Sequence, residues 1–598
     1  MVSCPIEKLR YKGTGILNGN HGKIRLILRH FSGSRRYFAA AVLASLLTTA
    51  LNALTPQIFR FSIDEVLGNG NYGYLAGHLW MMALAIVAVA ACSGLSMFAS
   101  RTCAARAGED FAKNLRDALF SHVQRLPMSW HDGNQTGDII QRCTSDVEVI
   151  RSFVATQLLE VFRTVFLVGI SFAMMVSMNR RLACVVLFFV PAVALYSAVF
   201  YRLIAKRFTV ADEAEGELST VVQENATGVR VVRAFGREAF EMERFREKNE
   251  RFASLWIRLG SLSGLYWGVG DLITGFQVIT VIVLGAMEAV HGTMTAGEFV
   301  AFASYNTVLV WPVRGLGRIL SDMSKAGVSF DRVNYILAGK EERYEQDRGV
   351  CPQNTDISFS HVSFGYVPGK EVLKDVSFEI PQGKIFGILG GTGSGKSTVA
   401  QLLTRLYELE EGCGSISVGG VDIREIPLEW LRRQVGMVLQ EPFLYSRTIR
   451  ENIAASAPEA SFEEIRQAAG TACIDEAIMS FPDGYDTLVG ERGVTLSGGQ
   501  RQRVAIARML LARPPIMVFD DSLSAVDSQT DYLIRQALKG RMKDATVILI
   551  SHRITTLMGA DQIMVLNHGQ VEEMGSHEEL IRGNGIYRQI YDIQRGEA

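Results

Sequence analysis

A glycine-rich segment ending in lysine and serine is the first part of this sequence that could do phosphate chemistry. Residues 390–398 read GGTGSGKST and fit G-x-x-x-x-G-K-[ST], a loop whose backbone N–H groups surround nucleotide phosphates. Lys396 is expected to bridge the β- and γ-phosphates of ATP, and the hydroxyl of Ser397 to bind Mg²⁺. A strand-like run, 384–389, precedes the loop and a helical pattern, 397–407, follows it, which is the context that the motif requires. The predicted nucleotide-binding residues of the loop are Gly390, Gly391, Thr392, Gly393, Ser394, Gly395, Lys396, Ser397 and Thr398.

A second phosphate-binding segment and two carboxylates follow further along the chain. Residues 496–500 read LSGGQ and open a predicted helix that two prolines end after about Ala512; free N–H groups at such a helix start favour a phosphate. The apolar run 516–519 then ends in Asp520 and Asp521, the way in which P-loop ATPases present a carboxylate to Mg²⁺. LSGGQ alone is also compatible with an ordinary turn and helix cap, but the three segments in this order favour an ATPase. The predicted contacts here are Ser497, Gly498, Gly499 and Gln500 for phosphate, and Asp520 for the metal.

Together these motifs resemble those of ABC transporters. From about residue 357 to the end, the chain is similar to an ABC nucleotide-binding domain, and the LSGGQ pentapeptide is specific to that family. The part before it resembles the membrane domain of an ABC exporter half-transporter. The resemblance implies ATP and Mg²⁺ as cofactors, ATP hydrolysis coupled to transport, and a second ABC exporter half as partner, because each nucleotide in this family lies between two motor domains.

The resemblance also assigns roles to residues outside the two glycine-rich segments. Tyr366 matches the aromatic side chain that stacks on adenine, and Gln440 matches the glutamine that reaches Mg²⁺ and the attacking water. His552, at the end of a strand-like run, matches the histidine that contacts the γ-phosphate. Glu491 matches a loop that contacts the membrane domain, and Asp527 a loop that crosses the dimer seam. Without the resemblance, a core tyrosine and a structural histidine are the simpler interpretations of Tyr366 and His552.

The chain departs from the family at the hydrolytic base, where Asp521 stands in place of the usual glutamate. Aspartate is one methylene shorter, so its carboxylate retreats by about 1.5 Å. A displacement of about 1 Å at a catalytic centre can lower the rate on the order of 100-fold. We therefore expect this chain's own site to bind ATP and hydrolyse it weakly, while its intact LSGGQ completes a partner's site. The pattern favours a heterodimer, with a homodimer of two slow sites as the alternative.

Length and composition indicate two large domains, one of them in a membrane. The chain has 598 residues, 48% of them hydrophobic, and its mean hydropathy of +0.15 is high for a soluble ATPase. Its net charge of −1 gives no general attraction to nucleic acid. The eight cysteines form no C-x-x-C pair, which argues against a zinc site or a disulfide framework.

Six apolar segments are long enough to be predicted as membrane-spanning helices. The sixth is the weakest by hydropathy. A basic amphipathic segment, 23–36, precedes them and is suited to lie in the membrane surface, although a solvated helix face is the alternative. The predicted spans are 37–59, 80–100, 153–176, 182–203, 262–290 and 296–320.

Basic residues orient these spans. Lysine and arginine are abundant between the second and third spans and between the fourth and fifth, and absent from loops 67–78 and 291–295. The positive-inside rule then places both termini and the motor domain in the cytoplasm, on the inner side of the cytoplasmic membrane. The two basic connections are expected to be helical extensions joined by turns, near 129–133 and from 224–228 to 232–238, which resemble the coupling helices of exporters.

Asp271 lies inside the fifth predicted span, with Gln277 one to two turns further along. A carboxylate at membrane depth is costly and normally faces a cavity or a partner group, so Asp271 is expected to line the translocation pathway. A position in the wetted cytoplasmic part of the helix is an equally simple interpretation.

The sequence therefore predicts a polytopic α-helical membrane domain followed by an α/β P-loop ATPase domain. The expected boundaries are 1–36 for the N-terminal segment, 37–337 for the transmembrane domain, 338–356 for a polar linker and 357–598 for the nucleotide-binding domain. The expected function is ATP-driven export of a hydrophobic or amphipathic drug, lipid or peptide across the cytoplasmic membrane. The alternative is a gate or regulator that binds ATP without pumping. The apolar spans exclude a soluble ATPase acting on DNA, and the fused architecture argues against an importer.

Overall fold

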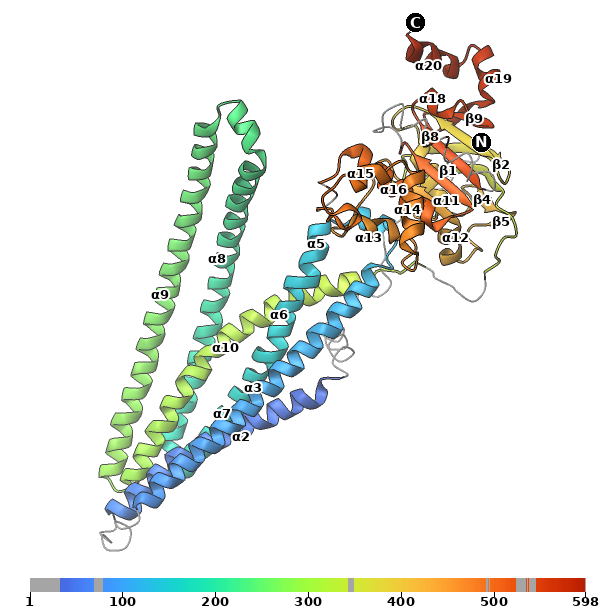
Figure 1. Ribbon diagram of the computed structural model, residues 1–598. Helices are drawn as coiled ribbons and strands as arrows, with labels where there is room; N and C mark the ends of the chain where they lie inside the picture. Colours follow the sequence, from blue (N-terminus) through green and yellow to red (C-terminus); the bar gives the residue numbers. More distant parts are fainter. Residues whose placement is uncertain are drawn as a thin grey trace. The chain divides into compact units, whose positions relative to one another are not determined.

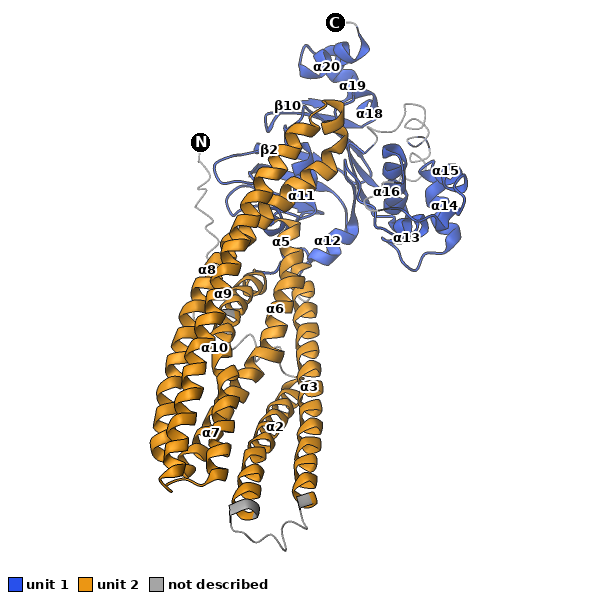
Figure 2. Cartoon of the chain, turned by 90° about the vertical axis from the view of Figure 1, so that its left-hand side faces the viewer, with its two compact units in different colours: residues 1–12, 125–134, 340–598 blue, residues 13–124, 135–339 orange. Residues whose placement is uncertain are grey.

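The computed structural model describes residues 33–68, 79–342, 349–490, 495–522 and 545–596, together with residues 493, 534 and 536. It divides into two compact units (Figure 2). The membrane unit comprises residues 13–124 and 135–339, and the motor unit comprises 1–12, 125–134 and 340–598. Most of the predicted amphipathic segment, as well as Glu491 and Asp527, lies outside the described residues, and the predicted domain boundaries stay predictions.

The membrane unit consists of long helices that pack side by side (Figure 1). Two of them begin with side-chain caps: Asn179 accepts a hydrogen bond from the N–H of Leu182, and Thr295 forms a capping box with Glu298. The long helices are α2 (Arg35–Phe61), α3 (Leu79–Val123), α7 (Leu158–Met178), α8 (Arg180–Ala234), α9 (Glu238–Val290) and α10 (Ala296–Leu337). The shorter elements are η1 (Ser62–Gly68), α5 (Thr136–Gln141), η3 (Arg142–Asp146), α6 (Val147–Ser152) and η4 (Phe153–Gln157).

Five of the six predicted spans lie in helices that are long and apolar enough, by length and composition, to cross a membrane among the described residues. The sixth, in α10, is a continuous helix of 42 residues but falls short in hydropathy. It still packs against α2, α7, α8 and α9. Its polar residues include Asn306, whose side chain accepts a hydrogen bond from the amide of Gln277 at 2.6 Å, so polar groups of neighbouring helices satisfy one another.

The structure has the first predicted turn between helical extensions near its expected position and the second one several residues later. The first contains a short helix, α4 (Met128–Asp132), which belongs to the motor unit. The second lies at 235–237, between α8 and α9, whereas residues 224–228 continue α8. The prediction that 224–228 leave the helix was wrong, because the side chain of Asn225 donates to the carbonyl of Val221 within α8 and to Glu241 of α9 and so stabilises the helical pair.

The motor unit contains two sheets. A six-stranded sheet has the order β10-β9-β3-β8-β7-β6, in which only β10 is antiparallel to its neighbour, and a four-stranded antiparallel sheet has the order β2-β1-β4-β5. The central strands are buried on both faces and read as continuous apolar runs, as expected for a parallel sheet covered by helices. The strands are β1 (Ile357–Phe364), β2 (Leu373–Ile380), β3 (Ile385–Leu389), β4 (Ser415–Val418), β5 (Val421–Asp422), β6 (Val435–Val438), β7 (Ile516–Asp520), β8 (Thr546–Ser551), β9 (Gln562–Asn567) and β10 (Gln570–Gly575).

Helices cover the sheets and form a helical subdomain between β6 and β7. The helices are α11 (Lys396–Leu403), α12 (Leu428–Gln434), α13 (Ile449–Ala454), α14 (Phe462–Thr471), α15 (Asp475–Met479), η5 (Gly484–Asp486), α16 (Gly498–Ala512), α18 (Ile554–Leu557), α19 (His577–Arg582) and α20 (Ile586–Arg595).

Candidate nucleotide site

The candidate site lies at one edge of the six-stranded sheet. Strands β3, β8, β7 and β6 are parallel neighbours in that order, so their carboxyl ends meet at the same edge. Each of the four strands delivers one predicted part of the site: the phosphate loop follows β3, His552 follows β8, the two aspartates end β7, and Gln440 follows β6. Ligands of open α/β sheets bind at such an edge. Segments that are more than 150 residues apart in sequence are therefore brought together by the strand order.

The phosphate loop has a backbone that only glycine tolerates at its key positions. Gly395, which precedes α11, has a φ of +101°, and a Cβ there would lie 2.6 Å from the side chain of Leu373. A Cβ on Gly391 would meet nothing within 4 Å, so the loop is open on that side. The buried hydroxyl of Ser394 has no hydrogen-bond partner in the described part of the chain. An open loop with an unsatisfied buried hydroxyl at a helix N-terminus fits a phosphate group.

Lys396 contacts the phosphate loop, and Ser397 hydrogen-bonds to Asp520. The ammonium of Lys396 donates to the carbonyls of Gly390 and Gly391, at 2.9 and 2.7 Å, and thus lies over the loop. Burial lowers the pKa of Lys396, and the carboxylates of Asp521 and Asp520 oppose that shift. Burial raises the pKa of Asp520, while a hydrogen bond from Ser397 opposes the shift. A serine hydroxyl and a buried carboxylate at the end of the phosphate loop are a donor set that fits Mg²⁺.

Asp521 and His552 form a hydrogen-bonded pair. Nδ1 of His552 lies 2.9 Å from Oδ2 of Asp521, and the backbone N–H of Asp521 donates to the carbonyl of Ile550 at 2.9 Å. Asp521 has a φ of +45°, a left-handed conformation that aspartate tolerates better than most residues. The imidazole is half-exposed and the carboxylate is mostly buried. The predicted base and the predicted γ-phosphate contact therefore bind each other in this structure.

Tyr366 lies beside the phosphate loop rather than in the core. Its hydroxyl is 3.0 Å from that of Thr398 and also hydrogen-bonds to Gln401 of α11. The ring packs edge-on against Tyr407, with 4.9 Å between centroids, and 43% of the residue is exposed. A partly exposed ring held at the phosphate loop suits base stacking, and the alternative of a core tyrosine is not what the structure shows.

The predicted signature segment begins α16, as its sequence indicates. Ser497 and Gln500 form a capping box, in which the N–H of Gln500 donates to the serine hydroxyl at 3.3 Å and the N–H of Ser497 donates to Gln500 at 2.8 Å. Gln502 of the same helix donates to the carbonyl of Gln440 at 3.4 Å. The side chain of Gln440 is exposed. The helix-cap and phosphate interpretations of LSGGQ are thus both compatible with this geometry.

Comparison with known proteins identifies the family. Residues 38–313 match the model of the ABC transporter transmembrane region, and residues 373–524 match the ABC transporter model. An uncharacterized ABC transporter ATP-binding protein, YknU, of Bacillus subtilis is 37% identical over 94% of this chain and 95% of its own length. The chain belongs to the ABC transporter family. This exporter is also 32% identical to an ATP-dependent lipid A-core flippase of Desulfotalea psychrophila, over 93% of this chain and 96% of the flippase.

A solved structure extends the likeness to three dimensions. A bacterial Atm1-family ABC exporter with ATP bound superposes with a TM-score of 0.81 at 27% identity, over 94% of this chain and 98% of that chain. The predicted fold class is therefore confirmed: a helical transmembrane domain is fused to an α/β ATP-binding domain. The protein is a multi-pass membrane protein and an ATPase coupled to transport.

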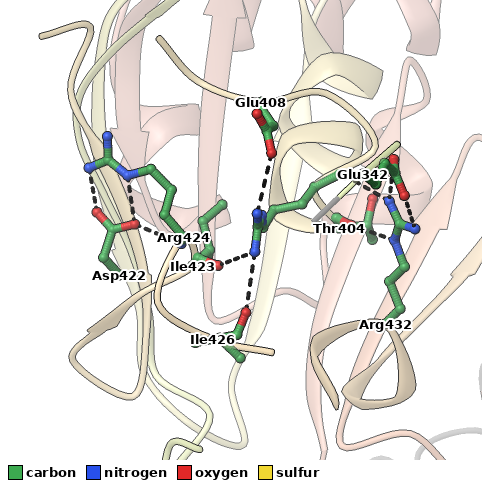
Figure 3. Close-up of polar contacts among 9 residues, drawn as sticks. Glu342, Thr404, Glu408, Asp422, Ile423, Arg424, Ile426 and Arg432 are labelled. Carbon is green, nitrogen blue, oxygen red and sulfur yellow. Dashed lines mark hydrogen bonds and ion pairs between the residues drawn. The ribbon is translucent and has the colours of Figure 1, made fainter. Parts of the chain in front are cut away.

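Sequence reasoning missed an ion pair between the linker and the motor domain (Figure 3). Arg432 of α12 donates to both carboxylate oxygens of Glu342, at 2.8 and 3.1 Å, and to the carbonyls of Thr404 and Arg405 at the end of α11. The N–H of Glu342 donates to the carbonyl of Arg125, in the segment that leads to α4. The exporter's linker is thus bound between the phosphate-loop helix and the first coupling turn. In the sequence, Glu342 is one of several charged residues in the polar linker, and no pattern distinguishes it from the others.

A second missed contact links α4 to the nucleotide site. The hydroxyl of Tyr407 donates to Asp132 of α4 at 2.5 Å, and the same tyrosine packs against Tyr366. Burial and the hydrogen bond to Asp132 raise the pKa of the Tyr407 phenol, which stays protonated as a donor. Tyr407 was visible only as the end of the predicted phosphate-loop helix.

Proposed function

We propose that this exporter is one half of a heterodimer that moves a hydrophobic or amphipathic substrate out of the cytoplasm across the cytoplasmic membrane. The relatives' names support the substrate class, since they include lipid A-core flippases, a putative multidrug exporter of Bacillus subtilis and a fatty acid ABC transporter of Mycobacterium bovis. In this proposal the motor domain and both termini face the cytoplasm. ATP binding closes two motor domains, the coupling turns pass the closure to the membrane helices, and hydrolysis resets them.

One observation carries the heterodimer proposal: an intact signature segment, 496–500, occurs in a chain whose base position holds Asp521. The short carboxylate hydrogen-bonds to His552 at 2.9 Å. In the proposed assembly this chain's phosphate loop, with Lys396, Ser397 and Asp520, binds ATP and Mg²⁺ and hydrolyses slowly. Its Ser497 and Gly499 complete the competent site of a partner that carries a glutamate.

Variants at two positions of this chain test the asymmetry. In the co-purified pair, Gly499→Asp should lower ATP turnover about 100-fold, because the added carboxylate repels the phosphate at the competent site. Asp521→Asn should change turnover little, because the weak site contributes little to it. Asp521→Glu should raise hydrolysis at the weak site about 10- to 100-fold.

A homodimer predicts a different result. There the two changes act on the same pair of sites, so Asp521→Asn and Gly499→Asp would lower turnover alike. Full substrate-stimulated turnover by this subunit purified alone would also contradict the heterodimer. ATP binding to the Gly499→Asp variant, measured with a fluorescent analogue, is the control for folding.

Transport separates the exporter from a gate or regulator. Inside-out vesicles that contain the pair should accumulate substrate against a gradient when ATP is supplied, and a gate cannot concentrate a substrate. A relative's substrate lipid and a lipophilic dye are the first compounds to assay.

A further inference from the structure

Four side chains of the membrane unit form a cluster between α9 and α10, and one of them is Asp271, the carboxylate predicted to line the translocation pathway. Trp267 and Asp271 are one helical turn apart on α9, and Trp311 and Arg314 are one turn apart on α10. Nη1 of Arg314 donates to Oδ1 of Asp271 at 2.6 Å. The guanidinium carbon of Arg314 lies 4.9 Å from the ring centroid of Trp267 and 5.7 Å from that of Trp311. We call these four residues the Trp–Asp cluster.

Burial divides the cluster into a covered half and an accessible half. The side chain of Arg314 is 4% exposed, whereas that of Asp271 is 70% exposed. Trp311 and Trp267 are 67% and 45% exposed, and their ring centroids lie 5.9 Å apart. A molecule that reaches the cluster therefore meets a carboxylate and two indole rings, with the guanidinium behind them.

Arg314 is held in its place by the surrounding helices. A Cβ on Gly270 would lie 2.6 Å from Nη2 of Arg314, so the glycine leaves room for the guanidinium. Nη2 also donates to the carbonyl of Trp267 at 3.5 Å, while the buried Nε finds no partner among the described residues. The arginine is thus a buried, incompletely satisfied cation, and among the described residues its ion-pair partner is Asp271.

The depth of the cluster places it at one boundary of the hydrocarbon layer. Asp271 lies about 19 residues before Val290, the end of α9, and Arg314 about 18 residues after Ala296, the start of α10. At about 1.5 Å per residue, both are roughly 28 Å from the turn that joins the two helices, close to the thickness of about 30 Å of a bilayer core. In the orientation proposed above, this boundary belongs to the cytoplasmic leaflet.

The charges determine which ligand fits. Asp271 and Arg314 sum to zero, but the negative end of the pair is the accessible one, and a carboxylate keeps acceptor capacity beyond a single hydrogen bond. Indole faces attract cations, most strongly where water is excluded. An anion would have to reach Arg314, which is covered.

We propose that the Trp–Asp cluster binds lipophilic organic cations that partition into the cytoplasmic leaflet. The inference rests on the proposed export function, for which it specifies a substrate class. Asp271 supplies the countercharge, Trp267 and Trp311 pack against the apolar groups of the cation, and Arg314 holds the carboxylate in position.

Tetraphenylphosphonium and tetraphenylborate test the proposal, because the two ions share size and shape and differ in charge. We expect the exporter in lipid nanodiscs, without ATP, to bind the phosphonium about tenfold more tightly than the borate after subtraction of lipid partitioning. Asp271→Asn and Trp311→Leu should each remove about tenfold of the phosphonium affinity. Glu288→Gln, which removes a carboxylate from the other end of α9, should leave it unchanged.

Folding and subunit contacts are controlled in the same series. If Asp271→Asn misfolds because Arg314 loses its partner, the double variant Asp271→Asn/Arg314→Gln removes both charges and is used instead. Equal affinities for the two ions, or full phosphonium affinity in the folded asparagine variant, would overturn the proposal. So would a loss of dimer on size-exclusion chromatography with unchanged phosphonium affinity, which would assign the carboxylate to a subunit interface. Binding is measured without ATP, so a failure of export would contradict the proposed function and leave the cation-binding result unaffected. Export of another compound without any cation binding would contradict the proposed cation site and leave the export function unaffected.

Discussion

Asp520 combines burial with a hydrogen bond from Ser397, and these act on its pKa in opposite directions. Burial dominates, so the pKa is raised. The folded motor domain consequently binds the Asp520 proton more tightly than the unfolded chain does, and this group's contribution to stability falls as the pH rises through the shifted range. The same proton competes with Mg²⁺ at a higher pH than it would at an exposed aspartate.

We therefore predict that the Mg²⁺ affinity of the ATP-bound motor domain decreases as the pH falls through the raised pKa of Asp520. Below that pKa the decrease approaches about tenfold per pH unit, the limit for one competing proton. Mg²⁺ titrations with a fluorescent ATP analogue, at neutral and mildly acidic pH, measure it. Asp520→Asn should bind Mg²⁺ more weakly and show only the titration of the phosphates. Parallel pH curves for the two proteins would contradict a role of Asp520 as metal ligand.

Asp521 shows how a single residue type can shift a mechanism. Its positive φ and its hydrogen bond to His552 are both compatible with a short carboxylate. A longer side chain at this position would need the same left-handed backbone, which costs more for glutamate than for aspartate. This backbone cost is the physical reason why the range of the gain expected from Asp521→Glu begins at about tenfold, below the factor of about 100 attributed to the retreat of the carboxylate.

At the scale of elements, α11 contacts both the nucleotide site and, through Arg432, the linker. Its first turn carries Lys396 and Ser397, Tyr366 hydrogen-bonds to Thr398 within it, and the carbonyls that follow its last turn accept from Arg432. Through Arg432 the linker residue Glu342 is bound to the same helix (Figure 3). The helix that follows the phosphate loop is therefore also in contact, through Arg432, with the linker.

We predict that Glu342→Gln lowers the stability of the motor domain by about 1–2 kcal/mol, because Arg432 loses a charge-assisted, mostly buried partner. A downward shift of its thermal unfolding midpoint checks this. Glu408→Gln is the matched control, since Glu408 also pairs with an arginine, Arg405, but is 70% exposed. Equal shifts of the unfolding midpoint in the two variants would mean that the linker ion pair contributes no more to stability than an exposed ion pair does.

At the scale of the whole molecule, the proposed topology follows from charge. The two loops between spans that lack lysine and arginine lie at one end of the predicted spans, and the basic extensions lie at the other. Arg180 and Arg181, between the third and fourth spans, run against this trend, but the opposite orientation would place both long basic extensions outside.

A labelling experiment checks the orientation. In a variant with Cys351 as its single cysteine, an impermeant maleimide should label the exposed thiol in inside-out vesicles and leave it unlabelled in intact cells. A cysteine introduced as His291→Cys, in the turn between α9 and α10, should show the reverse pattern. Labelling of both positions from the same side would contradict the topology.

The sequence alone determined the features that depend on neighbouring residues. The phosphate loop, the capped start of α16 and the strand that ends in Asp520 are local patterns, and their element types agree with the structure. Membrane helices were also predictable, because hydropathy is a property of a continuous segment. Even the strand-end positions of the site residues could be expected, since parallel strands present their carboxyl ends together.

Only the tertiary structure decided which distant side chains meet. Asp271 was visible as a carboxylate in a span, but its partner Arg314 is 43 residues away, on another helix. Asp132 and Tyr407 are 275 residues apart, and the exact site of the turn between α8 and α9 depends on contacts between the two helices. The register and rotation of packed helices are determined by many side-chain contacts at once, and no local pattern in the sequence records them.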